Sequence, residues 1–323
     1  TDTVIMLSLA FARGLERGQR VLHSFKHFVG DGGTVWDSTQ IAPWGNADNW
    51  QAATELYKID QGDTQIDEAE LRAIHLRPYR AAIEAGALNI MVSFSSWNGQ
   101  KMHSHKYLLT DVLKEEWGFA GFLISDWKAL DQIAPSYYDC VVQSINAGLD
   151  MVMTPYDFKL FIATLTEAVQ KGDVPQARVD DAVRRILRAK FAIGLFDQPF
   201  GDETLLPEVG SAAHRAIARE AVRKSAVLLK NNGQTLPLAK NLPSVLIAGS
   251  AADDVGIQCG GWTIAWQGVT NAIGNTPIGT SILQAIQQTV SPETVIHYQA
   301  LADFEEGVTA DVGIAVVGEL PYA

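Results

Sequence analysis

Short apolar runs that end in polar or aromatic residues recur along the first half of the chain. They cover residues 21–28, 88–94, 121–125 and 151–153. Other segments, at 68–84, 108–116 and 158–170, carry apolar residues at helical spacing. Strands that alternate with helices in this way predict a parallel sheet covered by helices. A closed (β/α)8 barrel has eight such strands, so we expect an α/β fold that holds only the later strands of a barrel.

One of these runs leads into a carboxylate. The segment 121–125 is followed directly by Asp126 and Trp127. A strand covered on both faces seldom carries a charge before its carboxyl end, and in (β/α)8 barrels the chemistry lies at those ends. Asp126 is therefore a candidate nucleophile or base. The structural alternative is that Asp126 caps a helix that begins near Lys128.

The composition changes after a predicted helix at 179–191. Glycine and proline at positions 194, 199, 201 and 207 interrupt regular structure there. A second unit begins near His214, and its apolar runs at 244–249 and 313–318 predict further parallel strands. We therefore expect a barrel portion at 1–198, a linker at 199–212 and a second α/β domain at 213–323.

Charge and composition exclude several classes of partner. The chain of 323 residues has a formal net charge of −12 and an isoelectric point near 5.0. Nucleic acid and anionic membranes both require a basic surface, so we expect neither as a partner, and a neutral substrate fits better. The two cysteines, Cys140 and Cys259, are too few and too far apart for a disulfide framework or a zinc site.

The chain opens on an apolar segment, residues 4–12, which has no basic leader and continues through Arg13 and Arg17. We expect a barrel helix there rather than a signal peptide. No apolar stretch approaches the roughly 20 residues that span a bilayer. Because the chain begins without Met, we expect a processed product or a fragment.

Seven ordered motifs spread along the chain carry a family resemblance. They read KHFVGDGGT at 26–34, SDW at 125–127, LF at 195–196, AREA at 218–221, LLKN at 228–231, GGWTIAWQG at 260–268 and GELPY at 318–322. In these motifs the chain resembles glycoside hydrolase family 3, and most nearly its β-glucosidases and exo-acting β-glucan glucohydrolases. The resemblance covers the whole chain except the segment 35–58.

The resemblance implies a (β/α)8-like barrel followed by an α/β sandwich domain, with the active site between them. Asp126 would be the nucleophile of a retaining mechanism that forms a covalent glycosyl-aspartate. Lys26 and His27 match the family's Lys-His pair, which would hydrogen-bond sugar hydroxyls, and the charge of Lys26 would help to keep carboxylates ionised. The structural alternative is a buried Lys paired with a barrel carboxylate. The mechanism requires no metal or cofactor.

Three further residues are expected to bind substrate. Met91 lies in the strand-like run 88–94, and Trp127 and Trp266 match a pair of tryptophans that would clamp a sugar ring on the leaving-group side. Stacking tolerates several linkages, so the preferred linkage stays open. The expected substrates are β-linked gluco-oligosaccharides or aryl and alkyl β-glucosides, and the expected location is secreted or periplasmic.

By the same resemblance, the general acid is a Glu that follows Ala323 immediately. Glu319 occupies a different position of the motif, so we do not expect it to serve as the acid. The early part of a family barrel would also supply an Asp and an Arg for sugar hydroxyls. We therefore expect this chain by itself to be inactive or very weak.

Departures from the family pattern bear on the alternatives. The family's N-acetylglucosaminidases carry Gly-His-Gly-Asp after the Lys-His strand, whereas residues 30–33 read Gly-Asp-Gly-Gly. An amino-sugar substrate is therefore the weaker alternative. Phe94 stands where relatives often have Tyr, which removes a hydroxyl near the nucleophile.

Two other classes of protein compete with a glycosidase. One is a non-catalytic carbohydrate-binding protein that keeps Lys26, His27 and Trp127. The other is a nucleotide-binding α/β protein, suggested by glycines within 249–256, but their spacing fits neither the dinucleotide fingerprint nor a P-loop.

The segment 35–58 shows no clean periodicity and contains Trp36, Trp44 and Trp50. Loops of this length are uncommon in compact domains unless they serve a site. Its indole rings either stack on sugar rings or pack the loop onto the barrel.

Overall fold

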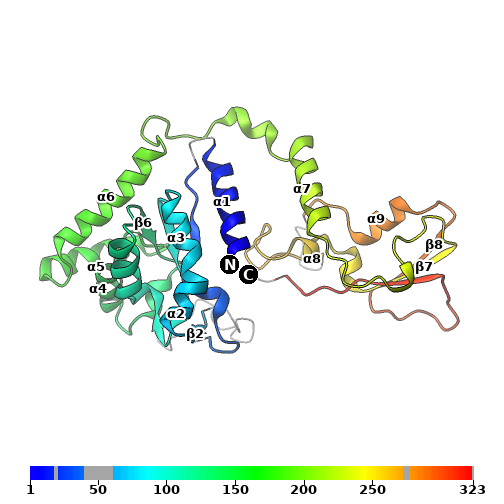
Figure 1. The fold of residues 1–323 in the computed structure, drawn as a ribbon, viewed down its shortest axis with the longest axis horizontal. Coiled ribbons are helices and arrows are strands. Elements are labelled where there is room, and N and C mark those ends of the chain that lie inside the picture. The colour runs from blue at the N-terminus through cyan, green and yellow to red at the C-terminus, as the bar shows by residue number, and fades with distance from the viewer. Residues whose placement is uncertain (18–20, 40–60, 272–276, 322–323) are drawn as a thin grey trace. The chain divides into compact units, whose positions relative to one another are not determined.

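The computed structural model describes residues 1–17, 21–39, 61–271 and 277–321. The chain divides into two compact units, Thr1–Leu206 and Pro207–Ala323, each of which is described by itself (Figure 1). The division falls within the segment 199–212. The predicted domain limits of 1–198 and 213–323 stay predictions.

A parallel sheet of three strands lies at the centre of the first unit. Its strands are β1 Phe25–Phe28, β3 Asn89–Val92 and β6 Phe122–Ile124, in the order β1-β3-β6. Met151 extends the sheet beyond β6 through a single parallel bridge to Ile124. The predicted runs at 21–28, 88–94 and 121–125 thus contain strands, each shorter than its apolar run, whereas 151–153 forms only the bridge.

The core of this unit forms on the sheet because each of its strands buries apolar side chains. Phe28, Ile90, Val92 and Leu123 have no exposed surface, and burying such a side chain contributes about 1.5–3 kcal/mol. The strands also approach closely where β6 begins. A Cβ atom on Gly121 would lie 2.4 Å from the carbonyl oxygen of Leu88, so only glycine fits there.

Helices surround this sheet (Figure 1). They are α1 Asp2–Glu16, α2 Glu68–Glu70, α3 Arg77–Glu84, α4 Tyr137–Ala147, α5 Phe158–Lys171 and α6 Gln176–Ala192, with the π-helical turns η2 Leu71–Leu76 and η4 Tyr107–Glu116. Short 3-10 turns are η1 Asp31–Gly33, η3 Met102–Ser104, η5 Ala129–Gln132 and η6 Glu203–Glu208. The predicted helices at 4–12, 68–84, 108–116, 158–170 and 179–191 are confirmed. Helix α4 was not predicted.

A small second sheet was also not predicted. It joins β2 Asp63–Thr64, β4 Ser96–Trp97 and β5 Gln100–Lys101, with β2 parallel and β5 antiparallel to β4. The tight β4–β5 turn is formed by Asn98 and Gly99, which both have positive φ angles, as a two-residue hairpin requires. This hairpin leads directly into η3, which reaches back under the end of β6.

The second unit holds another parallel sheet, in the order β8-β7-β9. Its strands are β7 Ser244–Ala248, β8 Val295–Gln299 and β9 Val312–Ala315, and its helices are α7 Ala212–Ser225, α8 Val255–Cys259 and α9 Ile282–Thr289, with 3-10 turns η7 Asn232–Gln234 and η8 Ser250–Asp253. Leu283 of α9 packs in one cluster with Val245 and Ile247 of β7. The runs at 244–249 and 313–318 are confirmed as strands. In neither unit is a described helix long and apolar enough to cross a membrane.

Candidate active site

The carboxyl ends of the parallel strands bring four predicted site residues to one edge of the sheet. Lys26 and His27 lie in β1, and Met91 in β3 pairs with Ile124 at the end of β6. Asp126 follows β6 by two residues. Because β1, β3 and β6 are parallel neighbours, these side chains share the edge at which barrel enzymes carry their chemistry.

Contacts with neighbouring residues fix both the side chain and the backbone of Asp126. Its Oδ1 accepts a hydrogen bond from the backbone N–H of Trp127 at 2.6 Å. Its Oδ2 lies 3.8 Å from Nε2 of His27, and the side chain is 23% exposed. The hydroxyl of Ser125 donates to the carbonyl oxygen of Asp126 and accepts the N–H of Met153, which ties this exit to the next strand position. The carboxylate is therefore fixed but reachable from solvent.

Two opposing effects act on the charge of this carboxylate. Burial raises the pKa of Asp126, while the Trp127 N–H, His27 and Lys26 lower it and the charge of Asp31 raises it further. Burial dominates, so the pKa of Asp126 is raised overall. Lys26 lowers the pKa of Asp126, which is the direction predicted for its effect on a nearby carboxylate. Lys26 is exposed, which contradicts the alternative of a buried lysine.

A second carboxylate, Asp31, was not predicted to belong to the site. Its Oδ2 lies 2.9 Å from Nδ1 of His27, four residues earlier in the chain. A carboxylate only accepts hydrogen bonds, so Nδ1 of His27 donates to Asp31, and Nε2 faces Asp126. The sequence could have indicated Asp31, because it stands in the same motif as His27. In the structure, η1 turns Asp31 back toward the strand.

His103 was also missed. Its Nε2 accepts the backbone N–H of Asp126 at 3.0 Å, and the residue is only 1% exposed. The side chain comes from η3, more than twenty residues before Asp126 along the chain. Only the closure of the β4–β5 hairpin places it there, so no local pattern in the sequence indicated it.

Beyond Asp126 the chain turns sharply. Trp127 is 45% exposed, and its ring meets Tyr156 edge to face with 6.1 Å between ring centres. Lys128 adopts a left-handed conformation with φ of 54°, which is uncommon for a residue other than glycine. Only then does η5 begin, at Ala129, so Asp126 does not cap a helix in the way the structural alternative required.

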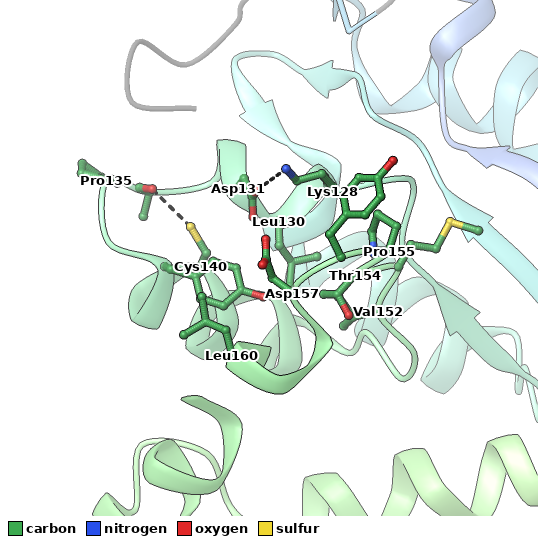
Figure 2. A pocket seen from close by; sticks show the side chains of 14 residues that line it. Lys128, Leu130, Asp131, Pro135, Cys140, Val152, Thr154, Pro155, Asp157 and Leu160 are labelled. Carbon is green, nitrogen blue, oxygen red and sulfur yellow. Dashed lines mark hydrogen bonds and ion pairs between the residues drawn. The ribbon is translucent and has the colours of Figure 1, made fainter. Parts of the chain in front are cut away.

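A cavity of about 220 Å³ opens beside this turn (Figure 2). Lys128 and Asp131 pair across 4.0 Å on its wall, and Tyr156 joins it to the indole of Trp127. Asp126 does not line the cavity, which therefore adjoins the carboxylate rather than containing it.

Trp266 belongs to the other unit. It is 36% exposed and meets Trp262 edge to face with 6.3 Å between ring centres. The two units are described separately, so the clamp of Trp127 and Trp266 stays a prediction. Glu319 is exposed in the same unit, whereas Ala323, after which the general acid was expected, lies outside the described residues.

Of Trp36, Trp44 and Trp50, Trp36 lies in the described part of the chain. Trp36 is 67% exposed, so its ring is not packed onto the barrel. Trp44 and Trp50 lie outside the described residues. Phe94 is buried, and its ring centre lies 6.2 Å from that of His103.

Among the described residues, no group of three or more His, Cys, Asp or Glu side chains is placed to hold a metal ion. Cys140 is buried and Cys259 exposed, and both are free thiols.

Proteins of known name resemble this chain in sequence and in fold. The chain is 33% identical over 289 residues to a lysosomal beta glucosidase of Dictyostelium discoideum, covering 82% of this chain and 35% of that protein. It is 34% identical over 251 residues to a periplasmic beta-glucosidase of Salmonella typhimurium, covering 74% and 31%. The crystal structure of an exo-1,3/1,4-beta-glucanase from a Pseudoalteromonas species superposes with a TM-score of 0.78 at 39% identity, covering 94% of this chain and 36% of that one. The chain thus spans about a third of the length of the curated relatives it matches.

Two family models account for most of the sequence. The glycosyl hydrolase family 3 N terminal domain matches residues 52–189, and the glycosyl hydrolase family 3 C-terminal domain matches residues 226–323. The predicted resemblance and the predicted fold class, later barrel strands followed by an α/β sandwich domain, are confirmed. The chain belongs to glycosyl hydrolase family 3.

Proposed function

We propose that this chain forms part of a retaining glycosidase that releases glucose from the non-reducing ends of β-glucosides or β-glucans. The observation that carries the proposal is the fixed carboxylate of Asp126 at the end of β6, with Oδ1 held by the Trp127 N–H and Oδ2 facing His27. A nucleophile needs this combination of orientation and access.

Asp126 acts in its ionised form. Its Oδ2 forms a bond to the anomeric carbon while the bond between that carbon and the glycosidic oxygen breaks, and the leaving oxygen takes a proton from a general acid. Water then cleaves the glycosyl ester and restores the carboxylate. Lys26 and His27 lower the pKa of Asp126 against the effect of burial, which keeps more of it charged. The general acid is a Glu beyond Ala323 rather than Glu319.

The sugar ring lies over the strand ends. His27 and Lys26 hydrogen-bond its hydroxyls, Met91 contacts it from β3, and the exposed face of Trp127 covers the ring on the leaving-group side. The names of the relatives support β-glucosides as the substrate class, and their periplasmic and lysosomal descriptions support a location outside the cytosol.

The experiment that tests the proposal traps the covalent intermediate. The full natural protein is incubated with a 2-deoxy-2-fluoro-β-glucoside, and its intact mass and peptide map are measured. We expect one added fluoroglucosyl group, on Asp126. Asp126→Asn should take no label, whereas the matched control Asp139→Asn, at an exposed carboxylate of α4, should be labelled like the parent.

Two results contradict the proposal in different ways. A label on another carboxylate moves the nucleophile away from Asp126. Unlabelled protein that still binds glucosides is the result expected of the non-catalytic carbohydrate-binding alternative.

A further inference from the structure

A buried imidazole lies directly behind the candidate nucleophile. His103 is 1% exposed, and its Nε2 accepts the backbone N–H of Asp126 at 3.0 Å. The next N–H along the chain, that of Trp127, is taken by Oδ1 of Asp126 itself. Two consecutive backbone donors at the end of β6 are therefore fixed, one by His103 and one by the carboxylate.

The position of His103 is set by a rigid turn. The N–H of Gly99 donates to Oδ1 of Asp63 at 2.8 Å, which anchors the β4–β5 hairpin to β2. The N–H of Met102 then donates to the carbonyl of Ser95 at 3.1 Å, and Met102 is fully buried. This support fixes where the imidazole of His103 lies, and catalytic constellations depend on such supporting contacts.

The imidazole accepts this hydrogen bond over the whole physiological pH range. Burial, together with the positive charges of Lys101 and His27, lowers the pKa of His103 to about 3. The ring is therefore neutral at any pH at which the protein works, with Nε2 unprotonated and Nδ1 carrying the hydrogen. A charged ring could not accept the Asp126 N–H, because both of its nitrogens would be donors.

We infer that His103 is a positioning residue for the nucleophile: by accepting the Asp126 N–H it fixes the backbone from which the carboxylate projects, and so aims Oδ2 toward His27. The inference rests on the proposed function, in which Oδ2 attacks the sugar. Without this contact the Asp126 N–H loses its partner, the exit of β6 relaxes, and the attacking oxygen leaves its line of approach. A misplacement of about 1 Å at a reacting atom can lower a rate by roughly 100-fold.

The test compares His103→Gln with His103→Asn in the full natural protein. The amide of Gln reaches the position of Nε2 and can accept the Asp126 N–H, whereas the shorter Asn cannot. With a 4-nitrophenyl β-glucoside, we expect His103→Asn to lower kcat by about 10- to 100-fold with KM nearly unchanged. His103→Gln should recover most of that loss, and labelling of Asp126 by the fluoroglucoside should slow in the same order.

His105 supplies the matched control. It is a second buried imidazole, two residues further along, and it packs on Trp97 with 5.4 Å between ring centres. His105→Asn removes a buried ring from the same turn but leaves the Asp126 N–H paired. It should lower Tm as His103→Asn does and leave kcat within about twofold of the parent.

The outcomes separate the inference from the function on which it rests. If the parent is labelled on Asp126 while His103→Asn keeps its kcat, or if Gln rescues no better than Asn, His103 has no positioning role. An equal loss of kcat in His105→Asn also overturns the inference, because the effect would then be general loosening. A parent that takes no label overturns the proposed function and this inference with it.

Discussion

Nε2 of His27 lies 3.8 Å from Oδ2 of Asp126, while Nδ1 of the same ring lies 2.9 Å from Oδ2 of Asp31. The imidazole of His27 therefore lies between two carboxylates. The side chain of Asp31, which holds the ring, is 47% exposed, and that of Asp126, which faces Nε2, is 23% exposed. A carboxylate that accepts a hydrogen bond from one ring nitrogen of a histidine commonly sets the orientation of the ring, and so the direction in which the other nitrogen points.

Asp31→Asn should weaken catalysis without touching the nucleophile. The charge-assisted hydrogen bond to His27 becomes a neutral one, a loss of about 1–1.5 kcal/mol, so kcat/KM should fall by roughly 5- to 10-fold. Burial is the main cause that raises the pKa of Asp126, and the charge of Asp31 adds to it. Removing that charge should move the acidic limb of the pH profile of kcat/KM to lower pH.

Asp67→Asn is the control for this change. Asp67 caps α2 through the N–H of Glu70 and is remote from His27, and Asn caps helices equally well. Its kinetics and pH profile should match the parent. An acidic limb that moves to higher pH in Asp31→Asn would contradict the arrangement described here.

Asp126→Asn should abolish turnover and yet stabilise the fold near neutral pH. Removal of the nucleophile should lower kcat by at least about 100-fold. Because burial raises the pKa of Asp126, its favourable contribution to stability is present at low pH and is lost as pH rises through that raised pKa. Above it, the carboxylate destabilises the folded state and a neutral Asn does not.

Thermal unfolding of parent and variant at several pH values checks this sign. Tm of Asp126→Asn should exceed that of the parent near pH 7, and the gap should close as pH falls toward about 4, the ordinary range of an Asp. A variant with a lower Tm than the parent at pH 7 would show that the carboxylate stabilises the site instead.

The residues of the site that could be predicted are those whose function follows from a single strand end. Lys26, His27 and Asp126 stand in short motifs at the carboxyl ends of apolar runs, and the parallel sheet brings them together. His103 could not be predicted in this way, because its contact with Asp126 depends on how a hairpin closes. Asp31 stands in the same motif as His27, but its contact with the His27 ring depends on the turn of η1.

The fold shows the same division. Strands β1, β3, β6, β7 and β9 could be predicted because each lies within or beside a continuous apolar run of the sequence. Strands of two residues, such as Ser96–Trp97, are too short to show any period. Strand β8, Val295–Gln299, was missed because His297 and Gln299 interrupt its apolar run.

Trp127→Ala should raise KM more than it lowers kcat. The indole is 45% exposed and offers its face to a ligand, and aromatic stacking contributes about 0.5–1.5 kcal/mol. KM for an aryl β-glucoside should therefore rise by roughly 3- to 10-fold. Trp127→Phe keeps an aromatic face and should lie between the parent and Trp127→Ala in steady-state kinetics. Equal KM values in all three proteins would remove Trp127 from the substrate site.

Asp150→Asn should destabilise the first unit strongly, because Asp150 neutralises two buried cations beneath β6. Its carboxylate accepts from Lys114 Nζ at 2.8 Å and from the backbone N–H of Leu123 at 2.8 Å, and it pairs with Arg178. The side chains of Asp150 and Lys114 are 0% and 5% exposed. Removing one partner of a buried ion pair costs about 3–5 kcal/mol, which lowers Tm by roughly 10 °C in a domain of this size.

The pH dependence of this loss follows from Lys114. Burial lowers the pKa of Lys114 to about 8, and the charge of Asp150 opposes that shift. A lysine whose folded-state pKa is lowered destabilises the fold when protonated, so stability is regained as pH rises above that value toward about 10.4. Without Asp150 the pKa should fall further, so Tm of Asp150→Asn should approach that of the parent between pH 7 and pH 9.5. Glu167→Gln, which removes only an exposed pair with Lys171, should change Tm little at either pH. A deficit for Asp150→Asn as small as that of Glu167→Gln would show that the buried carboxylate does not hold the base of the sheet.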